Sequence, residues 1–462
     1  MPLLRPRPSA GRAVTGTRRV RDDVHRPGRV VVAAFAVGLV VGTVLLALPV
    51  ARRGPGGAGL LEALFTATSA LCVTGLAVVD TPTYWSPFGQ VVILALIQVG
   101  GFGIMTFASL LGLLVSRRLG LGSRMVAATE TKTVGMGDLR SVLLGVARVT
   151  LVVEGVTAVV LAVRFATAYD EPPLRAAWLG VFHAVSAFNN AGFALWSDNL
   201  MGFVTDPWVC LPIAAAVLLG GLGFPVVLEV LRERRGVRRW SVHTRLTLLV
   251  SGVLLVGGTL FVTAAEWANP RTLGALDPAG RLLAGFFAAV MPRTAGFNSL
   301  DVGAMNTGTL LGTDVLMFIG GGSAGTAGGI KVGTFAVLLL AIAAELRGDP
   351  DVTLFDRRLA PATVRQALSV ALVSVAVVVA STVVVAMTSP YTLDQVLFEV
   401  VSAFATVGLS TGITADLAAG HQLLLVLLMF AGRVGPVTLA SALVLRQSHR
   451  MFRRPEGRPL IG

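Results

Sequence analysis

The chain has 462 residues, of which 54% are hydrophobic and only 14% are charged. Soluble domains carry about 25% charged residues, so this composition excludes an ordinary soluble protein and indicates a polytopic membrane protein. The net charge of +13 does not call for a nucleic-acid partner, because arginines between apolar stretches are what orients membrane helices.

Long apolar stretches follow one another along the chain and predict about eight spans, each near the 20 residues that cross the hydrocarbon. They fall near residues 31–50, 90–115, 142–164, 208–231, 246–266, 309–345, 366–387 and 421–445. The first stretch is too long for the apolar core of a typical signal peptide, so we interpret it as a retained helix. The stretch 309–345 is too long for one plain helix, and glycines interrupt it.

Basic residues predict the orientation of these spans. Clusters of arginine precede the first span and follow the second, fourth, sixth and eighth, whereas Arg52 and Arg53 fall on the other side. By the positive-inside rule both termini are then cytoplasmic, and the protein is a multi-pass component of the cell membrane. We therefore expect basic cytoplasmic tails at residues 1–29 and 451–462.

Four short apolar segments lie between the spans and align without gaps. They read LEALFTATSALCVTGL (61–76), WLGVFHAVSAFNNAGF (178–193), LLAGFFAAVMPRTAGF (282–297) and DQVLFEVVSAFATVGL (394–409). The fifth position is always Phe, the fifteenth is always Gly, and the sixteenth is Leu or Phe. Because the segments are too short to span a membrane, we predict that they are re-entrant, with core phenylalanines.

A second glycine follows each segment at a nearly constant distance. These glycines are Gly100, Gly220, Gly320 and Gly432, and they stand in QVGGFG, LLGGLG, FIGGGS and FAGRVG. The unit is thus a helix, a short re-entrant helix, a glycine-containing turn and a helix, used four times. We predict an all-α fold of four helix–pore-loop–helix repeats around a central ion pore, at residues 30–125, 126–240, 241–350 and 351–450. Four unrelated connectors would not explain glycines at fixed places.

A short helix that ends inside the membrane leaves free carbonyls with partial negative charge, which favours a cation. Four such ends, each followed by a turn, could form rings of main-chain oxygen that replace the hydration shell of potassium. The predicted potassium-binding residues are Val73, Thr74, Gly75, Asn190, Ala191, Gly192, Thr294, Ala295, Gly296, Thr406, Val407 and Gly408. We expect K⁺ only as the transported ion, and no cofactor in this chain.

At these residues the sequence resembles the Trk/Ktr/HKT superfamily of potassium transporters. The most specific stretches are MFIGGGSAGTAGGIKVGTF (Met317–Phe335), similar to the glycine-rich intramembrane loop of the family's third repeat, and MFAGRVGPVTL (Met429–Leu439), similar to its fourth-repeat inner helix. The chain is more similar to the Ktr branch, because it opens directly into the first repeat. It departs from the family at residues 322–324, where a small residue and proline are common. The resemblance implies potassium uptake, a homodimer and a cytoplasmic nucleotide-binding RCK-type regulatory subunit.

A dense run of glycines should unwind a helix, since each costs about 1 kcal/mol relative to alanine; close helix packing is the alternative. A charge at membrane depth costs at least about 2.5–3.5 kcal/mol, so Arg433 needs a reason. The resemblance implies that loop and arginine form a gate below the pore turns. A structural salt bridge from Arg433 to Glu154 or Glu399 is the other possibility. The candidate gate residues are Gly320, Gly321, Gly322, Ser323, Gly325, Gly328, Gly329 and Arg433.

Four further polar residues have ordinary structural explanations. Glu62 and Asp394 fall where predicted pore helices begin, and an acidic side chain is favourable there. We expect His183 to be packed in its pore helix. Lys331 either anchors the glycine-rich loop or extends to the membrane surface, and the second account is simpler.

Other functions fit the sequence less well. A sodium-permeable member of the same family is the near alternative, but there a serine replaces the first pore-loop glycine, which here is Gly75. A coupled organic-solute transporter usually has two inverted repeats, whereas these four units share one orientation. An enzyme is not expected, because the spans hold no zinc motif, Ser/Lys pair or aspartate dyad, and Cys72 and Cys210 fit no metal spacing.

Overall fold

The computed structural model describes residues 27–118, 139–233, 236–355 and 357–445. The predicted basic tail at 451–462, and all but the last three residues of the tail at 1–29, lie outside the described residues. Much of the basic connection after the second predicted span also lies outside them.

The described chain is almost entirely helical, because a helix satisfies its own backbone hydrogen bonds where no water is available. One short antiparallel hairpin pairs β1 (Thr353–Leu354) with β2 (Arg357–Arg358). The helices are α2 (Pro27–Ala47), α3 (Leu60–Leu71), α4 (Thr81–Tyr84), α5 (Pro87–Arg118), α7 (Leu139–Ala168), α8 (Pro173–Phe188), α9 (Pro207–Leu222), α10 (Phe224–Arg232), α11 (Val242–Glu266), α12 (Pro278–Val290), α13 (Thr307–Phe318), α14 (Val332–Arg347), α15 (Pro361–Thr388), α16 (Leu393–Ala405) and α17 (Ala419–Leu445). The fold is therefore all-α, as predicted.

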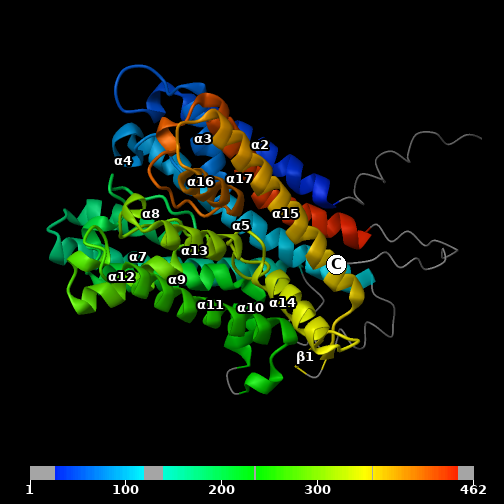
Figure 1. Cartoon of the computed structure of the whole chain (residues 1–462). Helices are drawn as coiled ribbons and strands as arrows, with labels where there is room; N and C mark the ends of the chain where they lie inside the picture. Colours follow the sequence, from blue (N-terminus) through cyan, green and yellow to red (C-terminus); the bar gives the residue numbers. More distant parts are fainter. Residues whose placement is uncertain (1–26, 119–138, 234–235, 356, 446–462) are drawn as a thin grey trace, which may run out of the picture.

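The predicted spans correspond to long helices or to interrupted pairs. Within the described residues, α7, α11 and α15 are each long and apolar enough to cross a membrane, and α9 with α10 would make another span. That pair is bent by 99°, a break the sequence analysis did not predict. The overlong stretch 309–345 is interrupted as predicted, between α13 and α14. Figure 1 shows the start of α2, in dark blue, and the end of α17, in red, at the same end of the molecule.

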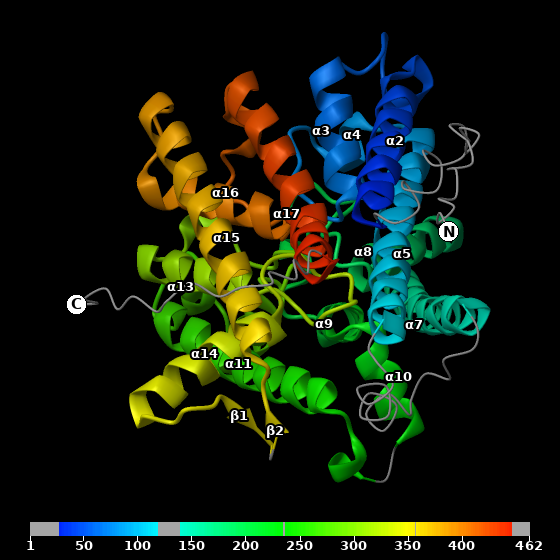
Figure 2. The same ribbon diagram turned by 90° about the vertical axis from the view of Figure 1, so that its right-hand side faces the viewer.

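The four short apolar segments form the short helices α3, α8, α12 and α16, each packed on the long helix before it. Contacts between successive units close a ring, since α5 packs on α8, α9 on α12 and α13 on α16. The ring is completed by α17, which packs on both α16 and α3 and lies between them in Figure 2. The last helices of the chain thus return to the first.

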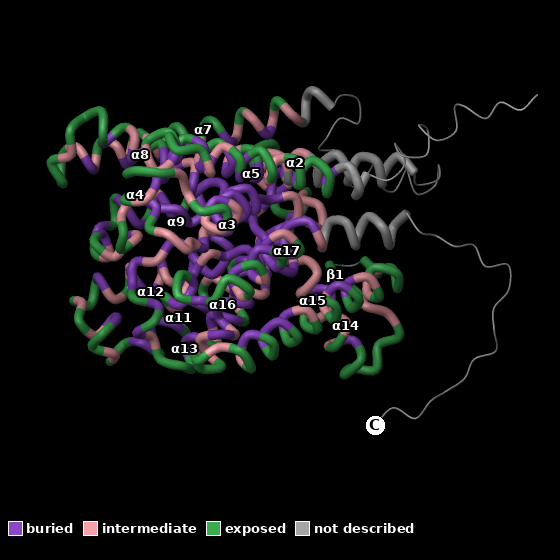
Figure 3. Tube along the Cα trace, turned by 90° about the horizontal axis from the view of Figure 1, so that it is seen from above, coloured by how far each residue is buried: buried purple, intermediate pink, exposed green. Residues whose placement is uncertain are grey.

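Buried residues gather around α3, α16 and α17 in the interior, whereas α7 and α13 carry many exposed residues (Figure 3). Three of the four predicted core phenylalanines, Phe65, Phe182 and Phe398, are completely buried. The fourth position differs, because Phe286 is only half-buried and its neighbour Phe287 is the buried ring. In α12 the apolar face is therefore shifted by one residue.

In the first, second and fourth units, the second glycine allows a long helix to touch the end of a short one. A Cβ added at Gly100 would lie 1.9 Å from the Leu71 carbonyl oxygen, and one at Gly432 would lie 1.7 Å from that of Phe404. Gly220 is packed in the same way against Phe188, at 1.9 Å. No side chain fits at such distances, so glycine is required by close approach.

We predict that Gly100→Ala lowers the free energy of unfolding by about 1–3 kcal/mol, because the new methyl group overpacks this contact. Gly103→Ala, one turn later in α5, is the matched control, since its Cβ would meet nothing within 4 Å. Alanine favours the helix at both positions, so only the contact with Leu71 distinguishes them. Thermal unfolding of the purified protein measures the difference, and equal stability of the two variants would contradict the packing role of Gly100.

Candidate functional site

Each short helix leads into a turn of the same unusual backbone conformation. We call these turns 1 (Val73–Gly75), 2 (Asn190–Gly192), 3 (Thr294–Gly296) and 4 (Thr406–Gly408). The first residue of each has a positive φ, at 57°, 60°, 66° and 51° in turns 1 to 4. The glycine that ends each turn also has a positive φ, at 95°, 70°, 71° and 96°.

The first position of the turns is strained. Valine and threonine rarely adopt a left-handed φ, yet they do so in turns 1, 3 and 4. Such a residue costs about 1–3 kcal/mol and persists only where the surroundings impose it, which is typical of functional sites. The same left-handed φ in four turns that are far apart in the sequence indicates a shared geometric requirement.

The turn glycines close a ring of main-chain contacts. A Cβ at Gly75 would lie 2.4 Å from the Ala191 carbonyl oxygen in turn 2. A Cβ at the glycine of turn 2 would lie 2.7 Å from the Ala295 carbonyl oxygen in turn 3, and one at the glycine of turn 3 would lie 2.3 Å from the Val407 oxygen in turn 4. A Cβ at the glycine of turn 4 would lie 2.0 Å from the Thr74 oxygen, back in turn 1. Every turn therefore approaches the middle carbonyl of the next one too closely for any residue except glycine.

Serines at the ninth position of three segments hold the turns, and the sequence analysis did not single them out. Ser69 and Ser402 each accept a hydrogen bond at 3.0 Å from the main-chain N–H of the glycine in their own turn. Ser186 donates to the Phe193 carbonyl at 2.8 Å. The third segment has Val290 here, and the Ala295 N–H bonds the Met291 carbonyl at 3.0 Å instead. The recurrence of serine in the aligned segments was the available signal.

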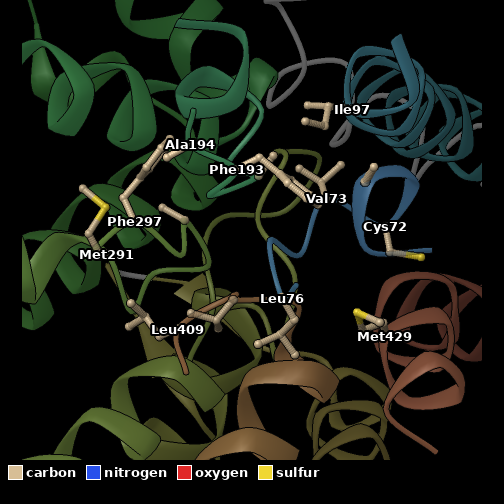
Figure 4. Close-up of a cluster of buried hydrophobic side chains, with 14 of the residues drawn as sticks. Cys72, Val73, Leu76, Ile97, Phe193, Ala194, Met291, Phe297, Leu409 and Met429 are labelled. Carbon is tan, nitrogen blue, oxygen red and sulfur yellow. The ribbon is translucent and has the colours of Figure 1, made fainter. Parts of the chain in front are cut away.

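An apolar shell surrounds the ring. The residues that follow the turn glycines, Leu76, Phe193, Phe297 and Leu409, are all buried, and Figure 4 shows them in one cluster. Beside the ring, a cavity of about 280 Å³ is lined by Gly75, Gly192, Asp80 and Asn199, among others. Turns 1 and 2 therefore border an open space on one side.

Buried polar side chains fix the segments behind the ring. His183 is fully buried, as predicted, with Nδ1 donating to the Leu179 carbonyl at 2.7 Å and Nε2 accepting from the Leu195 N–H at 3.2 Å. Glu399 accepts from the Thr411 N–H at 3.0 Å and from the Thr414 hydroxyl at 2.8 Å. These bonds tie the chain after turns 2 and 4 to the short helices before them.

The residues between α13 and α14, here called the glycine loop (Gly320–Gly329), are bound to the bend between α9 and α10. The N–H of Gly322 donates to the Gly221 carbonyl at 2.8 Å, and that of Thr326 donates to the Gly220 carbonyl at 3.1 Å. Gly223, with φ of 96°, forms the bend, and a Cβ there would lie 2.3 Å from the Ser323 oxygen. The bend and the loop therefore fit together.

The glycine loop also contacts three of the four turns. The Thr326 hydroxyl donates to Oδ1 of Asn190 at 2.8 Å, and the Gly328 N–H donates to the Thr294 hydroxyl at 3.1 Å. In turn 4, a Cβ at Gly328 would lie 2.0 Å from the Thr406 hydroxyl oxygen. The structure thus places the loop directly against the ring.

Arg433 reaches the same loop from α17. Its side chain is 3% exposed, and Nη1 donates to the Thr326 carbonyl. Among the described residues, Nε and Nη2 have no hydrogen-bond partner. The alternative of a salt bridge to Glu154 or Glu399 is wrong, because Glu154 bonds Gln98 and Asn189 and Glu399 bonds residues after turn 4.

The remaining polar predictions are also resolved. Glu62 and Asp394 lie in the first turns of α3 and α16, as expected. The preferred account of Lys331 is wrong, because its ammonium group donates to the Ala327 carbonyl and so closes the end of the glycine loop.

The fold and the composition define a multi-pass helical membrane protein. Comparison with known proteins identifies the family: residues 25–453 match the TrkH family, which is described as cation transport protein. The chain belongs to this family of cation transporters.

Two named relatives match this chain over almost their whole length. The chain is 39% identical to the Ktr system potassium uptake protein B of Bacillus subtilis, over 94% of this chain and 97% of the relative. It is 34% identical to the potassium/sodium uptake protein NtpJ of Enterococcus hirae, over 96% of this chain and 99% of that one. The crystal structure of the potassium transporter TrkH from Vibrio parahaemolyticus shares the fold, with a TM-score of 0.71, 18% identity and coverage of 93% and 86%.

Proposed function

We propose that this protein takes up potassium across the cell membrane through the ring formed by turns 1 to 4. The observation that carries the proposal is the cyclic contact of each turn glycine with a main-chain carbonyl of the next turn. Rings of carbonyl oxygen can replace the hydration shell of potassium, and recognition by main chain explains why the side chains differ between turns. The four turns are the proposed selectivity filter.

The short helices add a favourable field. At most one residue separates the C-terminal ends of α3, α8 and α16 from their turns, and three residues separate the end of α12 from turn 3. A helix C-terminus carries partial negative charge, which attracts a cation in a medium of low dielectric constant. This arrangement supports cation passage over the alternative of a coupled organic-solute transporter.

The ion is proposed from the relatives and from the first turn. The relative in Bacillus subtilis is named for potassium uptake, and the relative in Enterococcus hirae for both potassium and sodium. Gly75 carries no side chain that would displace the turn-1 carbonyls, which favours potassium. Sodium passage through the same ring is the second candidate.

We further propose that the glycine loop and Arg433 obstruct the path below the ring. The loop lies against turns 2, 3 and 4, and Arg433 holds it through the Thr326 carbonyl. The buried guanidinium, two of whose nitrogens have no hydrogen-bond partner within the described residues, adds a fixed positive charge that repels a cation. Obstruction would thus have a steric and an electrostatic part.

The assembly is proposed from the names of relatives and from charge. Two relatives are called protein B of a Ktr system, which supports a complex with a further subunit. We propose a homodimer that binds a cytoplasmic nucleotide-binding RCK-type subunit. Both termini would be cytoplasmic, because basic clusters accumulate on that side of the predicted spans.

Expression of the full chain should restore growth of a cell that lacks potassium uptake when external potassium is low. The same cells should accumulate rubidium, a potassium substitute, in proportion to the amount of protein in the membrane. Growth that stays absent although the folded protein is present in the membrane would contradict the proposed function.

Gly75→Ser should lower the potassium-to-sodium flux ratio about tenfold or more, because a Cβ would collide with the Ala191 carbonyl and displace it. Gly54→Ser is the matched control, since Gly54 has nearly the same φ, 96°, but nothing within 4 Å of an added Cβ. Flux of each cation into reconstituted vesicles gives the ratio. A folded Gly75→Ser protein with the ratio of the control would remove turn 1 from the filter.

Arg433→Ala should raise potassium flux about tenfold, which corresponds to a barrier lowered by about 1.4 kcal/mol. Arg433→Gln removes the charge, and its amide nitrogen lies two bonds short of the position of Nη1, whereas Arg433→Lys keeps the charge but lacks a donor at that position. A charge barrier predicts fast flux in the Ala and Gln variants and slow flux in the Lys variant, and a contact-based restraint predicts fast flux in all three. Unchanged flux in a folded Arg433→Ala protein would show that Arg433 is no part of the obstruction.

A further inference from the structure

Asn190 is held from two sides by partners of different kinds. Its Oδ1 accepts from the Thr326 hydroxyl of the glycine loop at 2.8 Å, and its Nδ2 donates to the Arg293 carbonyl at 3.3 Å. Asn190 is the first residue of turn 2, and Arg293 directly precedes turn 3. One amide group therefore connects the loop, turn 2 and the start of turn 3.

The connection is buried. Asn190 is completely buried, and Thr326 is 1% exposed. A buried amide oxygen that loses its donor must find another or pay the cost of desolvation. If the loop leaves, Asn190 loses the only protein donor that its Oδ1 has among the described residues.

We propose that Thr326 is a positioning residue for ion selectivity, which couples the place of the glycine loop to the geometry of turns 2 and 3. While the loop is seated, the Thr326 hydroxyl fixes the Asn190 amide, so that Nδ2 stays directed at the Arg293 carbonyl. Displacement of the loop frees the amide to rotate, and both turns relax. The slow flux that passes beside the seated loop therefore discriminates better between potassium and sodium than the faster flux after the loop has moved.

This inference rests on the proposed function and goes further than a simple obstruction. An obstruction that only blocks the path would change the flux of both cations equally when it moves. A loop that is hydrogen-bonded to the turns changes the ratio of the two fluxes as well. The ratio is thus the measurement that a purely steric or structural role of Thr326 would leave unchanged.

The test replaces the hydroxyl and keeps the shape. Thr326→Val removes the donor to Asn190, together with the longer bond of the same hydroxyl to the Phe188 carbonyl at 3.3 Å, but retains the main-chain bonds of Thr326 to Gly220 and Arg433. Thr326→Ser keeps the donor. Thr43→Val is the matched control, since its hydroxyl is also buried but bonds the Leu39 carbonyl in α2 at 2.8 Å, away from the loop. Thr326→Ala serves as a second hydroxyl-free variant if valine prevents folding.

In vesicles, Thr326→Val should lower the potassium-to-sodium flux ratio by about threefold or more, the scale on which contacting side chains couple. Thr326→Ser and Thr43→Val should keep the ratio of the unaltered protein. The effect should vanish in an Asn190→Gly background, because glycine retains the left-handed turn but has no amide to position.

Two results would overturn the proposal: an unchanged ratio in folded Thr326→Val, or the same fall in ratio with and without the Asn190 side chain. Gly75→Ser, measured beside these variants, separates this failure from that of the proposed function. If Gly75→Ser changes the ratio and Thr326→Val does not, the turns form the filter but the loop does not tune it. If neither changes it, the assignment of the filter itself is wrong.

Discussion

The structure depends on the approach of each turn glycine to the main-chain carbonyl of the next turn. These contacts leave no room for a Cβ, so they fix four chain segments at distances that only backbone can reach. The arrangement of the helices follows from it. Each short helix must end at the ring, each long helix must pack on a short one, and α17 must return to α3 for the ring to close. The long helices and the short helices that lead to the turns are thus held in one closed arrangement.

Much of this fold could be predicted, because the composition indicates membrane helices and the repeated segments indicate four similar units. The fifteenth position of the aligned segments must be glycine for a steric reason, and the same reason makes Gly100 and Gly432 visible in the sequence. The loop was visible as well, because a run of glycines cannot continue a helix. What repeats for a physical reason can be found by alignment of a chain with itself.

The rest could not be predicted because its cause lies in tertiary contact. A left-handed φ at Val73 or Thr406 could not be predicted from the residue type, because both residues are β-branched and disfavour it. The contacts of the ring impose this conformation. The partner of Arg433 is a main-chain carbonyl, which any residue could supply, so the sequence suggested acidic side chains instead. The bend at Gly223 is explained by the loop that fits against it, a segment about a hundred positions later.

The third unit shows how one departure from the repeat makes room for the loop. Pro292 lacks an N–H and cannot continue a helix, and α12 ends at Val290, earlier in its segment than α3, α8 or α16 end in theirs. In the other units the second glycine packs against the carbonyl at the eleventh position of the segment. In the third, Gly320 packs 2.0 Å, measured from an added Cβ, from the carbonyl of Gly328. The loop has therefore taken the place that the end of a short helix holds elsewhere. A segment that replaces the end of a short helix is well placed to act on the ring, because Thr326 and Gly328 contact turns 2, 3 and 4 directly.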